Sequence, residues 1–210
     1  QKLKKFFFPN KYYFLEYNLE KIRLMKPAIS EEDITLVSEV IRSGNLVEGA
    51  RTKELEALIA NLCNTASCTM CTSATIGLEL SLKALGIGPG DEVIVPNFTH
   101  PASALAVMNV GAEPVLVDVD LNTYNVTTES MKKGLSQKTK AIMPVSWGGN
   151  PLPMKEMAAF FKAQSIYIIE DAACSLGSYY NQEPTGKYAD TTVFSFHPRK
   201  LIAMGDGGCV

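Results

Sequence analysis

The sequence predicts an α/β domain built on a mainly parallel sheet with helices on both faces. Short apolar runs recur along the chain, which is typical of strands that are buried on both faces. Stretches with helical periodicity separate these runs and are bounded by glycine, proline and N-capping residues. This alternation of strand and helix indicates βαβ units in one sheet.

Two helices are expected to precede the sheet. Ser30 offers an N-cap, and the acids at 31–33 favour the positive end of the helix dipole, so a helix is expected from 31 to about 42 and ends at Gly44. A second helix is expected over residues 52–63. Its apolar residues fall on one face, namely Leu55, Leu58, Ile59 and Leu62.

The remaining elements alternate. Strands are expected at 68–71, 92–96, 114–118, 141–145, 166–170, 191–196 and 207–210, and helices at 73–85, 101–110, 128–135 and 154–164. Residues 1–24 are basic and aromatic and lack this periodicity. We therefore predict an atypical N-terminal extension over 1–24 and one large domain over 25–210.

Composition excludes several classes of function. The chain has 210 residues, 20% of them charged, and a formal net charge of −2, which gives no reason to expect a nucleic acid or an anionic membrane as partner. No apolar run reaches the roughly 18 residues of a transmembrane helix. The apolar run at 6–8 is too short for a signal peptide. We therefore expect a cytoplasmic protein.

The five cysteines are expected to be reduced, because their number is odd and no secretory signal precedes them. Cys68 and Cys71 form a C-x-x-C pair, but the chain has neither a second such pair nor a pair of histidines beside it. We expect these two thiols to be small buried apolar groups and expect no bound metal.

Candidate site residues follow from the predicted sheet, because ligands bind at the carboxyl ends of parallel strands. The segments just past the predicted strands are 72–75 (TSAT), 97–100 (NFTH), 118–120 (DVD), 146–149 (SWGG), 170–171 (ED) and 195–200 (SFHPRK). They combine a lysine, acids, an aromatic group and a helix N-terminus with hydroxyls. Pyridoxal 5′-phosphate (PLP) requires these groups for its aldehyde, its ring nitrogen, its ring and its phosphate.

Segment 194–200 (FSFHPRK), followed by 205–208 (GDGG), resembles the lysine motif of the DegT/DnrJ/EryC1/StrS family of nucleotide-sugar aminotransferases. Four further stretches are similar to that family: 42–49 (RSGNLVEG), 84–96 (ALGIGPGDEVIVP), 111–120 (GAEPVLVDVD) and 169–173 (IEDAA). The resemblance covers residues 26–210 and implies the large domain of a fold-type I PLP-dependent transferase.

The resemblance implies that Lys200 carries PLP as a Schiff base and moves the proton during the reaction. Asp171 would pair with the pyridine nitrogen. A surface lysine and a helix-capping aspartate are the alternative interpretations of these two residues.

The resemblance also implies a phosphate site made of the turn Ser73-Ala74-Thr75 and the hydroxyl of Ser195. The family usually has glycine where Ala74 stands, and alanine is tolerated there only if its φ is negative. A plain N-cap for the following helix is the alternative interpretation of this turn.

Three further positions near the cofactor depart from the usual family residues. His100 stands at the position that stacks on the PLP ring, and a histidine that caps the next helix is the alternative. Cys174 stands where glutamine or histidine often lies near the cofactor's 3-hydroxyl, although a thiol is a poor hydrogen-bond donor. Trp147 either lines the substrate channel or belongs to the core, and Ser146 replaces a common histidine.

The reaction that the resemblance implies is amino transfer from an amino acid, usually glutamate, to a keto-sugar attached to a nucleotide. Family members form homodimers and continue beyond the lysine motif into a small C-terminal domain, so we expect the chain to be a fragment. A catalytically incomplete fragment or pseudo-enzyme that keeps the PLP fold is one alternative. A PLP-dependent sugar dehydratase is another, although such relatives replace the lysine with histidine.

Overall fold

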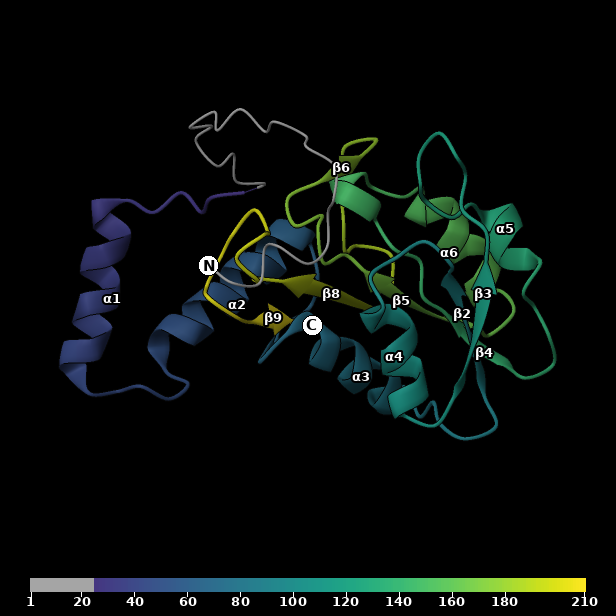
Figure 1. Cartoon of the computed structure of the whole chain (residues 1–210), viewed down its shortest axis with the longest axis horizontal. Coiled ribbons are helices and arrows are strands. Elements are labelled where there is room, and N and C mark those ends of the chain that lie inside the picture. Colours follow the sequence, from purple (N-terminus) through teal and green to yellow (C-terminus); the bar gives the residue numbers. More distant parts are fainter. Residues whose placement is uncertain (1–24) are drawn as a thin grey trace, which may run out of the picture.

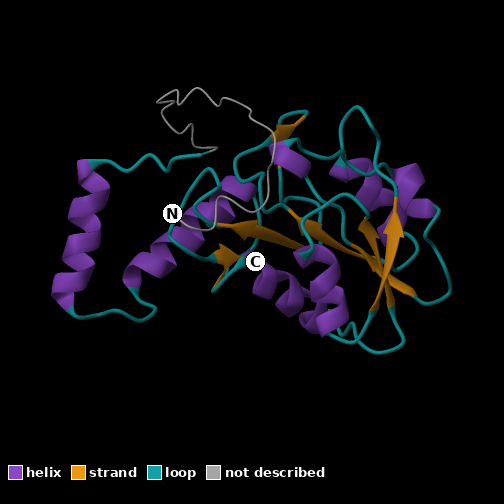
Figure 2. Ribbon diagram, in the orientation of Figure 1, coloured by secondary structure: helices purple, strands orange, loops and turns teal. Residues whose placement is uncertain are grey.

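The central sheet has seven strands in the order β1-β9-β8-β5-β4-β2-β3, and a two-stranded hairpin, β6-β7, lies apart from it (Figures 1 and 2). The computed structural model describes residues 25–210, so the predicted extension over 1–24 lies outside the described residues. The strands are β1 (Met70–Cys71), β2 (Glu92–Pro96), β3 (Glu113–Val117), β4 (Thr139–Ile142), β5 (Tyr167–Asp171), β6 (Tyr179–Tyr180), β7 (Glu183–Pro184), β8 (Thr191–Ser195) and β9 (Gly208–Cys209). The helices are α1 (Glu31–Ser43), α2 (Ala50–Cys63), α3 (Ala74–Ala84), α4 (Ala102–Asn109), α5 (Thr128–Lys132), the 3₁₀ helix η2 (Trp147–Gly149) and α6 (Met154–Lys162).

Strands β3, β2, β4, β5 and β8 are parallel neighbours, and only β9 runs against the strands beside it, β8 and β1. The prediction of a mainly parallel sheet covered on both faces is therefore confirmed. Parallel strands need crossover connections, and helices α4, α5 and α6 lie in the connections along the chain.

The core consists of a layer on each face of the sheet. Val93 and Val95 face α3 and α4, and they pack with Leu78, Leu82 and Ala106. Ile94, which lies between them in β2, faces the opposite layer, in which α5 and α6 contribute Met131, Met157 and Phe161. Successive side chains of a strand point to opposite faces, so a continuous apolar strand such as β2 supplies both layers.

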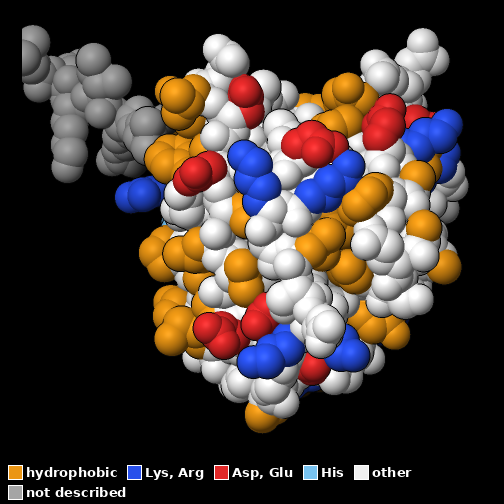
Figure 3. Space-filling view, turned by 90° about the vertical axis from the view of Figure 1, so that its right-hand side faces the viewer, with side chains coloured by type: hydrophobic (Ala, Val, Ile, Leu, Met, Phe, Trp, Pro, Cys, Tyr) orange, Lys and Arg blue, Asp and Glu red, His pale blue; other side chains and the backbone are white. Residues whose placement is uncertain are grey.

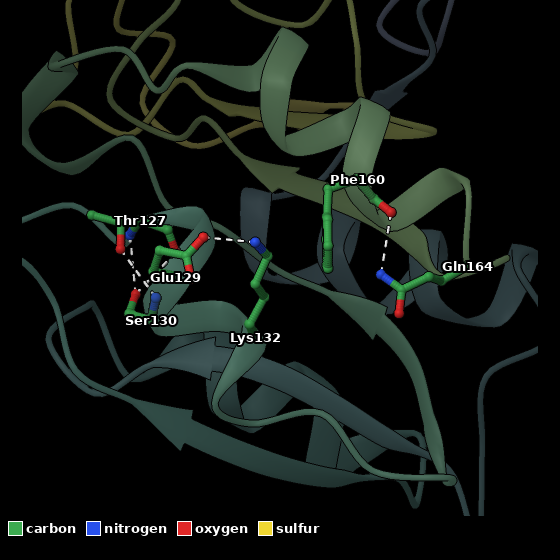
Figure 4. Close-up of polar contacts among 6 residues, drawn as sticks. All are labelled: Thr127, Glu129, Ser130, Lys132, Phe160 and Gln164. Atoms are coloured by element: carbon green, nitrogen blue, oxygen red, sulfur yellow. Dashed lines mark hydrogen bonds and ion pairs between the residues drawn. The ribbon is translucent and has the colours of Figure 1, made fainter.

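Helices α5 and α6 come together where Lys132 lies beside the ring of Phe160 (Figure 4). Thr127 and Ser130 form a reciprocal capping box at the start of α5. Lys132, near the end of α5, pairs with Glu129 at 2.6 Å and places its Nζ 4.1 Å from the centre of the Phe160 ring in α6. This cation–π contact joins the two helices over the sheet.

The predicted apolar face of α2 is only partly correct. Ile59 is buried beside Phe194 and Phe196 in a third apolar cluster, and Leu55 packs against it. Leu58 and Leu62, in contrast, are exposed. The side chains that reach the core follow an i, i+4 stripe through Leu55 and Ile59, and Leu58 and Leu62 lie on the neighbouring stripe.

Helix α1 stands away from the sheet (Figure 1) and has no buried residue. Its ends follow the prediction, because Ser30 and Asp33 form a capping box and the helix ends at Ser43 before Gly44. The helix is therefore held mainly by local interactions and by an exposed ion pair between Glu39 and Arg51 of α2, at 3.8 Å, and its apolar side chains do not reach the core.

Charges of both signs are spread over the surface. On the face that Figure 3 shows, acidic and basic side chains are interspersed with hydrophobic ones, in keeping with the small net charge. Among the described helices, none combines the length and the apolar character that crossing a membrane requires.

Most predicted elements lie within a few residues of the observed ones, and the differences are local. The first predicted strand is reduced to β1 (Met70–Cys71), and the predicted helix over 128–135 ends at Lys132. The hairpin β6-β7 and the short helix η2 were not predicted. Each of these missed elements spans only two or three residues, too few to establish a period in the sequence.

Candidate active site

The predicted site residues meet where parallel strands β2, β4, β5 and β8 end. Beyond the end of β4, Val145 forms a parallel bridge with Asp171, and the backbone N–H of Ser146 donates to the carbonyl of Asp171 at 3.1 Å. The segment after β4 therefore lies against the end of β5. This arrangement agrees with the expectation that strand ends of a parallel sheet form one site.

Asp171, the last residue of β5, is buried, and its carboxylate accepts two hydrogen bonds. The Ser103 hydroxyl donates to Oδ2 at 2.7 Å, and the N–H of Ala173 donates to Oδ1 at 3.2 Å. Burial raises the pKa of Asp171, and the two hydrogen bonds and the positive charges of Lys200 and His100 oppose that rise. The site therefore offers a buried acid that a cation would stabilise in its charged form.

Lys200 lies in the turn after β8, where its backbone N–H donates to the carbonyl of His197 at 2.8 Å. Its Nζ donates to Sγ of Cys174 at 3.0 Å. Cys174 follows Asp171 by three residues, so this contact brings the amine to the segment just past β5. The loop returns to the sheet through the bond from the N–H of Phe196 to the carbonyl of Gly207.

The predicted phosphate turn forms the start of α3. Ser73 is the N-cap, and its hydroxyl accepts from the N–H of Ile76 at 3.3 Å. The N–H groups of Ala74 and Thr75 lie in the first turn, where a helix supplies no internal partner. Ala74 has a negative φ, so alanine in place of glycine causes no backbone strain. The cap and the anion-binding interpretations are compatible, because the hydroxyl caps the helix while these N–H groups remain available.

Gly208 in β9 brings Ser195 and this turn together. Gly208 pairs with Ser195 in the sheet, and a Cβ on Gly208 would lie 2.6 Å from the backbone N of Ala74 and 2.7 Å from the carbonyl carbon of Ser73. Only glycine allows this approach without a shift of the backbone. The Ser195 hydroxyl accepts from the N–H of His197 at 3.3 Å and can still donate.

His100 adopts the capping geometry that was the alternative interpretation. Its Nδ1 accepts from the N–H of Ala102 at the start of α4, at 3.2 Å. The same residue is near enough to Asp171 to affect its ionisation. A capping histidine and a ring beside the cofactor are thus not exclusive, and the stacking role stays a prediction.

Trp147 belongs to a partly exposed cluster of rings and is not a core residue. Its ring lies 4.8 Å from that of Phe98, which lies 5.5 Å from that of Tyr124. We call these three residues the aromatic shelf. Phe98 and Tyr124 are 44% and 48% exposed, and Tyr124 has a φ of 57°, a conformation that is costly for a bulky residue and is often found at functional sites.

Gly149 connects the shelf to the lysine. It has a φ of 85°, and a Cβ there would lie 2.9 Å from the carbonyl oxygen of Cys174. The Ser178 hydroxyl donates to the carbonyl of Gly149 at 2.8 Å. The 3₁₀ turn that carries Trp147 is therefore held against the segment that contacts Lys200.

Glu170 precedes Asp171 and is a second buried acid. It accepts from the N–H of Gly186 at 3.1 Å and from the Ser146 hydroxyl at 3.2 Å. Burial raises its pKa to about 7, which the two hydrogen bonds oppose and the neighbouring Asp171 reinforces. Ser146, which replaces a common histidine of the family, thus ties the end of β4 to β5.

Cys68 and Cys71 are half-buried, so the expectation of buried thiols is met only in part. Their segment lies at the edge of the sheet, where one side remains open. It borders a cavity of about 570 Å³ that contains none of the predicted site residues. Within residues 25–210, no three histidine, cysteine or acidic side chains come together in a way that suits a metal ion.

Sequence reasoning missed Ser103 and Tyr124 as site residues. Ser103 lies 68 residues before Asp171, and no local pattern marks a serine in a helix as the partner of an acid in a strand. The αL conformation of Tyr124 depends on a turn in which its N–H donates to the carbonyl of Asp120 at 2.8 Å. The Asx turn of Asp120 was the available signal.

The residues present fit PLP. A phosphate suits the N–H groups at the start of α3, which Gly208 leaves accessible and the helix dipole favours. A basic ring nitrogen suits the buried carboxylate of Asp171, and an aldehyde suits the primary amine of Lys200.

Comparison with known proteins gives one family. The model of the DegT/DnrJ/EryC1/StrS aminotransferase family matches residues 27–210. The UDP-N-acetyl-3-dehydro-alpha-D-glucosamine 3-aminotransferase of Acidithiobacillus ferrooxidans is 40% identical over 183 residues, which are 87% of this chain and 50% of that protein. The spore coat polysaccharide biosynthesis protein SpsC of Bacillus subtilis is 35% identical over 196 residues, which are 93% of this chain and 49% of SpsC.

Solved structures agree with this similarity. Spr1654 of Streptococcus pneumoniae, assigned as a sugar aminotransferase, has structures in PMP and PLP forms with a TM-score of 0.85 to this chain and 35% sequence identity. The match with the PMP form covers 90% of this chain and 51% of Spr1654. The chain spans about half the length of the curated relatives it matches.

Proposed function

Because the chain belongs to the DegT/DnrJ/EryC1/StrS aminotransferase family, we propose that it binds PLP and serves in amino transfer to a sugar. The observation that carries this proposal is the proximity of Lys200 and Asp171 at the carboxyl ends of β8 and β5. Lys200 reaches Cys174, three residues beyond Asp171, and its charge acts on the Asp171 carboxyl. When bound, PLP supplies an electron sink for the carbon that loses a proton.

Lys200 is proposed to hold the cofactor through Nζ and, when released, to carry the proton between substrate and cofactor carbons. A primary amine suits both tasks, since it is a nucleophile and a base when unprotonated. Retention of this lysine argues against the dehydratase alternative, in which family members carry histidine at this position.

Asp171 is proposed to keep the cofactor's ring nitrogen protonated. Burial disfavours a lone carboxylate here, so a cationic partner would be bound through a charge-assisted hydrogen bond worth about 1.5–3 kcal/mol. Ser103 holds Oδ2 in place, which leaves the orientation of the acid fixed before the cofactor arrives.

The phosphate is proposed to lie at the start of α3, on the N–H groups of Ala74 and Thr75 and the hydroxyls of Ser73, Thr75 and Ser195. Donors at the N-terminus of α3 that have no partner within the helix support this role. His100 and Cys174 are proposed to border the ring.

The substrates are proposed to be an amino acid donor, glutamate in the first instance, and a keto-sugar linked to a nucleotide. The aromatic shelf supports this choice, because half-exposed rings beside the lysine segment offer a stacking surface for a flat base or a sugar face. We further propose a homodimer in the cytoplasm, where the five free thiols would remain reduced.

The proposal is tested by mixing the chain with PLP, reducing with borohydride and locating the label by peptide mass spectrometry. We expect a yellow complex and a label on Lys200. Lys200→Arg, which keeps the charge but cannot form the adduct, is the matched control. Absence of label on Lys200 would refute cofactor attachment. If Lys200 is labelled but added glutamate leaves the yellow complex unchanged, the result would favour an incomplete fragment or a pseudo-enzyme.

A further inference from the structure

Cys174 differs from the other cysteines in both exposure and neighbours. It is the one exposed thiol of the five. Cys63 and Cys209 are buried in the apolar cluster that contains Phe194, and Cys68 packs against that cluster. The reactive group that Cys174 contacts is instead the amine of Lys200, 3.0 Å from its sulfur.

We propose that Cys174 and Lys200 form a peroxide-dependent covalent cross-link that blocks the lysine. Hydrogen peroxide first oxidises the thiol to a sulfenic acid and releases one water. The unprotonated amine then attacks the sulfur, an S–N bond forms, and a second water leaves. The sulfur loses two electrons and the peroxide gains them, so one thiol, one amine and one peroxide give one sulfenamide and two waters.

The geometry favours this step. Backbone hydrogen bonds hold the segments that carry the two side chains. The N–H of Lys200 donates to the carbonyl of His197, and beside Cys174 the N–H of Ser175 donates to the carbonyl of Ala172. The flexible lysine side chain therefore needs only a short movement to bring Nζ onto the sulfur. Exposure lets a small oxidant reach the thiol, and exposure is one of the factors that decide which thiols are oxidised.

The consequence of the cross-link rests on the proposed function. The linkage uses the same Nζ that is proposed to hold PLP, so the oxidised chain would fail to attach the cofactor. A sulfenamide is opened by added thiol, which would return both side chains. The site would thus stop binding cofactor under peroxide and recover under reducing conditions.

The test uses the chain without PLP, treated with hydrogen peroxide, digested and examined by mass spectrometry. We expect a peptide pair that joins Cys174 to Lys200 and is lighter by about 2 Da than the two reduced peptides together. Dithiothreitol should separate the pair. The pair should be absent in Cys174→Ser and unchanged in Cys68→Ser, which removes a half-buried thiol elsewhere.

Dimedone, which traps sulfenic acids, detects any Cys174 that is oxidised but not linked to Lys200. Dimedone is added only after the peroxide treatment has ended. Its capture on Cys174 in chains whose Lys200 stays unlinked would overturn the proposal, because the sulfenic acid would then persist beside the amine without reacting. A Lys200 cross-link in Cys174→Ser would overturn it too. Whether the cross-link blocks attachment of PLP to Lys200 is measured separately, by adding PLP and borohydride after the peroxide treatment. Labelling should fall in proportion to the linked fraction and return with dithiothreitol, and undiminished labelling of linked chains would refute the block. Lack of cofactor attachment in untreated chain concerns the proposed function alone, because cross-linking requires no PLP.

Discussion

Replacing Gly208 with alanine tests how the phosphate turn is built. The added Cβ would lie 2.6 Å from the N of Ala74, 2.7 Å from the carbonyl carbon of Ser73 and 2.8 Å from the carbonyl oxygen of Phe194. All three neighbours are backbone atoms, so β9 or the start of α3 must move. Overpacking of this kind costs about 1–3 kcal/mol.

The same substitution also removes freedom from the unfolded chain, which stabilises by about 0.4–1 kcal/mol. We therefore expect Gly208→Ala to lower the free energy of unfolding by about 1–2 kcal/mol. Gly88→Ala is the matched control, because its Cβ would meet only the Val110 carbonyl oxygen at 3.6 Å. Neither glycine has a left-handed φ, so the two variants differ in steric contact.

Urea unfolding measures the difference, and Trp147, the one tryptophan of the chain, provides the fluorescence signal. Gly208→Ala should lower the urea midpoint at unchanged slope and weaken PLP binding in an absorbance titration. Gly88→Ala should be neutral or slightly more stable. Equal midpoints for the two variants would refute the reasoning that β9 presses on the turn.

Three further predictions concern the site. Ser103→Ala removes the 2.7 Å hydrogen bond to Asp171 and should raise the PLP dissociation constant roughly 10- to 100-fold, from a loss of about 1.5–3 kcal/mol; an unchanged titration curve would contradict this. Burial raises the pKa of Glu170 from 4.5 to about 7, so the folded chain keeps a proton that the unfolded chain releases, and stability falls as pH rises between these values. Between pH 5 and 7.5 that fall amounts to about 2 kcal/mol. Glu170→Gln should remove it in urea unfolding at these two pH values, and parallel pH curves for variant and parent would count against the reasoning. Phe98→Ala should leave borohydride labelling by PLP intact and weaken nucleotide-sugar binding by about 0.5–1.5 kcal/mol, read from quenching of Trp147; equal binding would exclude the shelf from the substrate site.

The fold was predictable because the evidence for it is local and repeated. The run at 92–96 was expected as a strand and is β2, and the neighbouring helices begin and end within a few residues of their signals. The backbone conformation of Ala74 could not be predicted from the sequence, because an alanine in that turn was compatible with a negative φ or with a strained positive φ. The structure decides between them because Ala74 is the first residue of α3.

The site was less predictable where contacts join distant segments. Lys200 and Asp171 could be named as site residues because they lie at or just past the ends of predicted strands. The contact between Lys200 and Cys174, in contrast, depends on how the loop after β8 folds back. The Ser103–Asp171 bond joins a helix to a strand across the sheet. Such pairs leave no period or motif in one sequence, because each partner alone looks like an ordinary polar residue.

The detachment of α1 has a consequence for hydrogen exchange. The helix has 13 residues, no buried side chain, local caps and an exposed ion pair from Glu39 to Arg51 of α2, and an isolated helix of this length is marginal in water. Its amide hydrogens should exchange through local opening, far faster than those of β5 in the core. Any surface that later covers Ile34, Val37 and Ile41 would slow exchange in α1 alone. Hydrogen exchange in α1 would therefore detect contacts that form on this helix, outside the sheet.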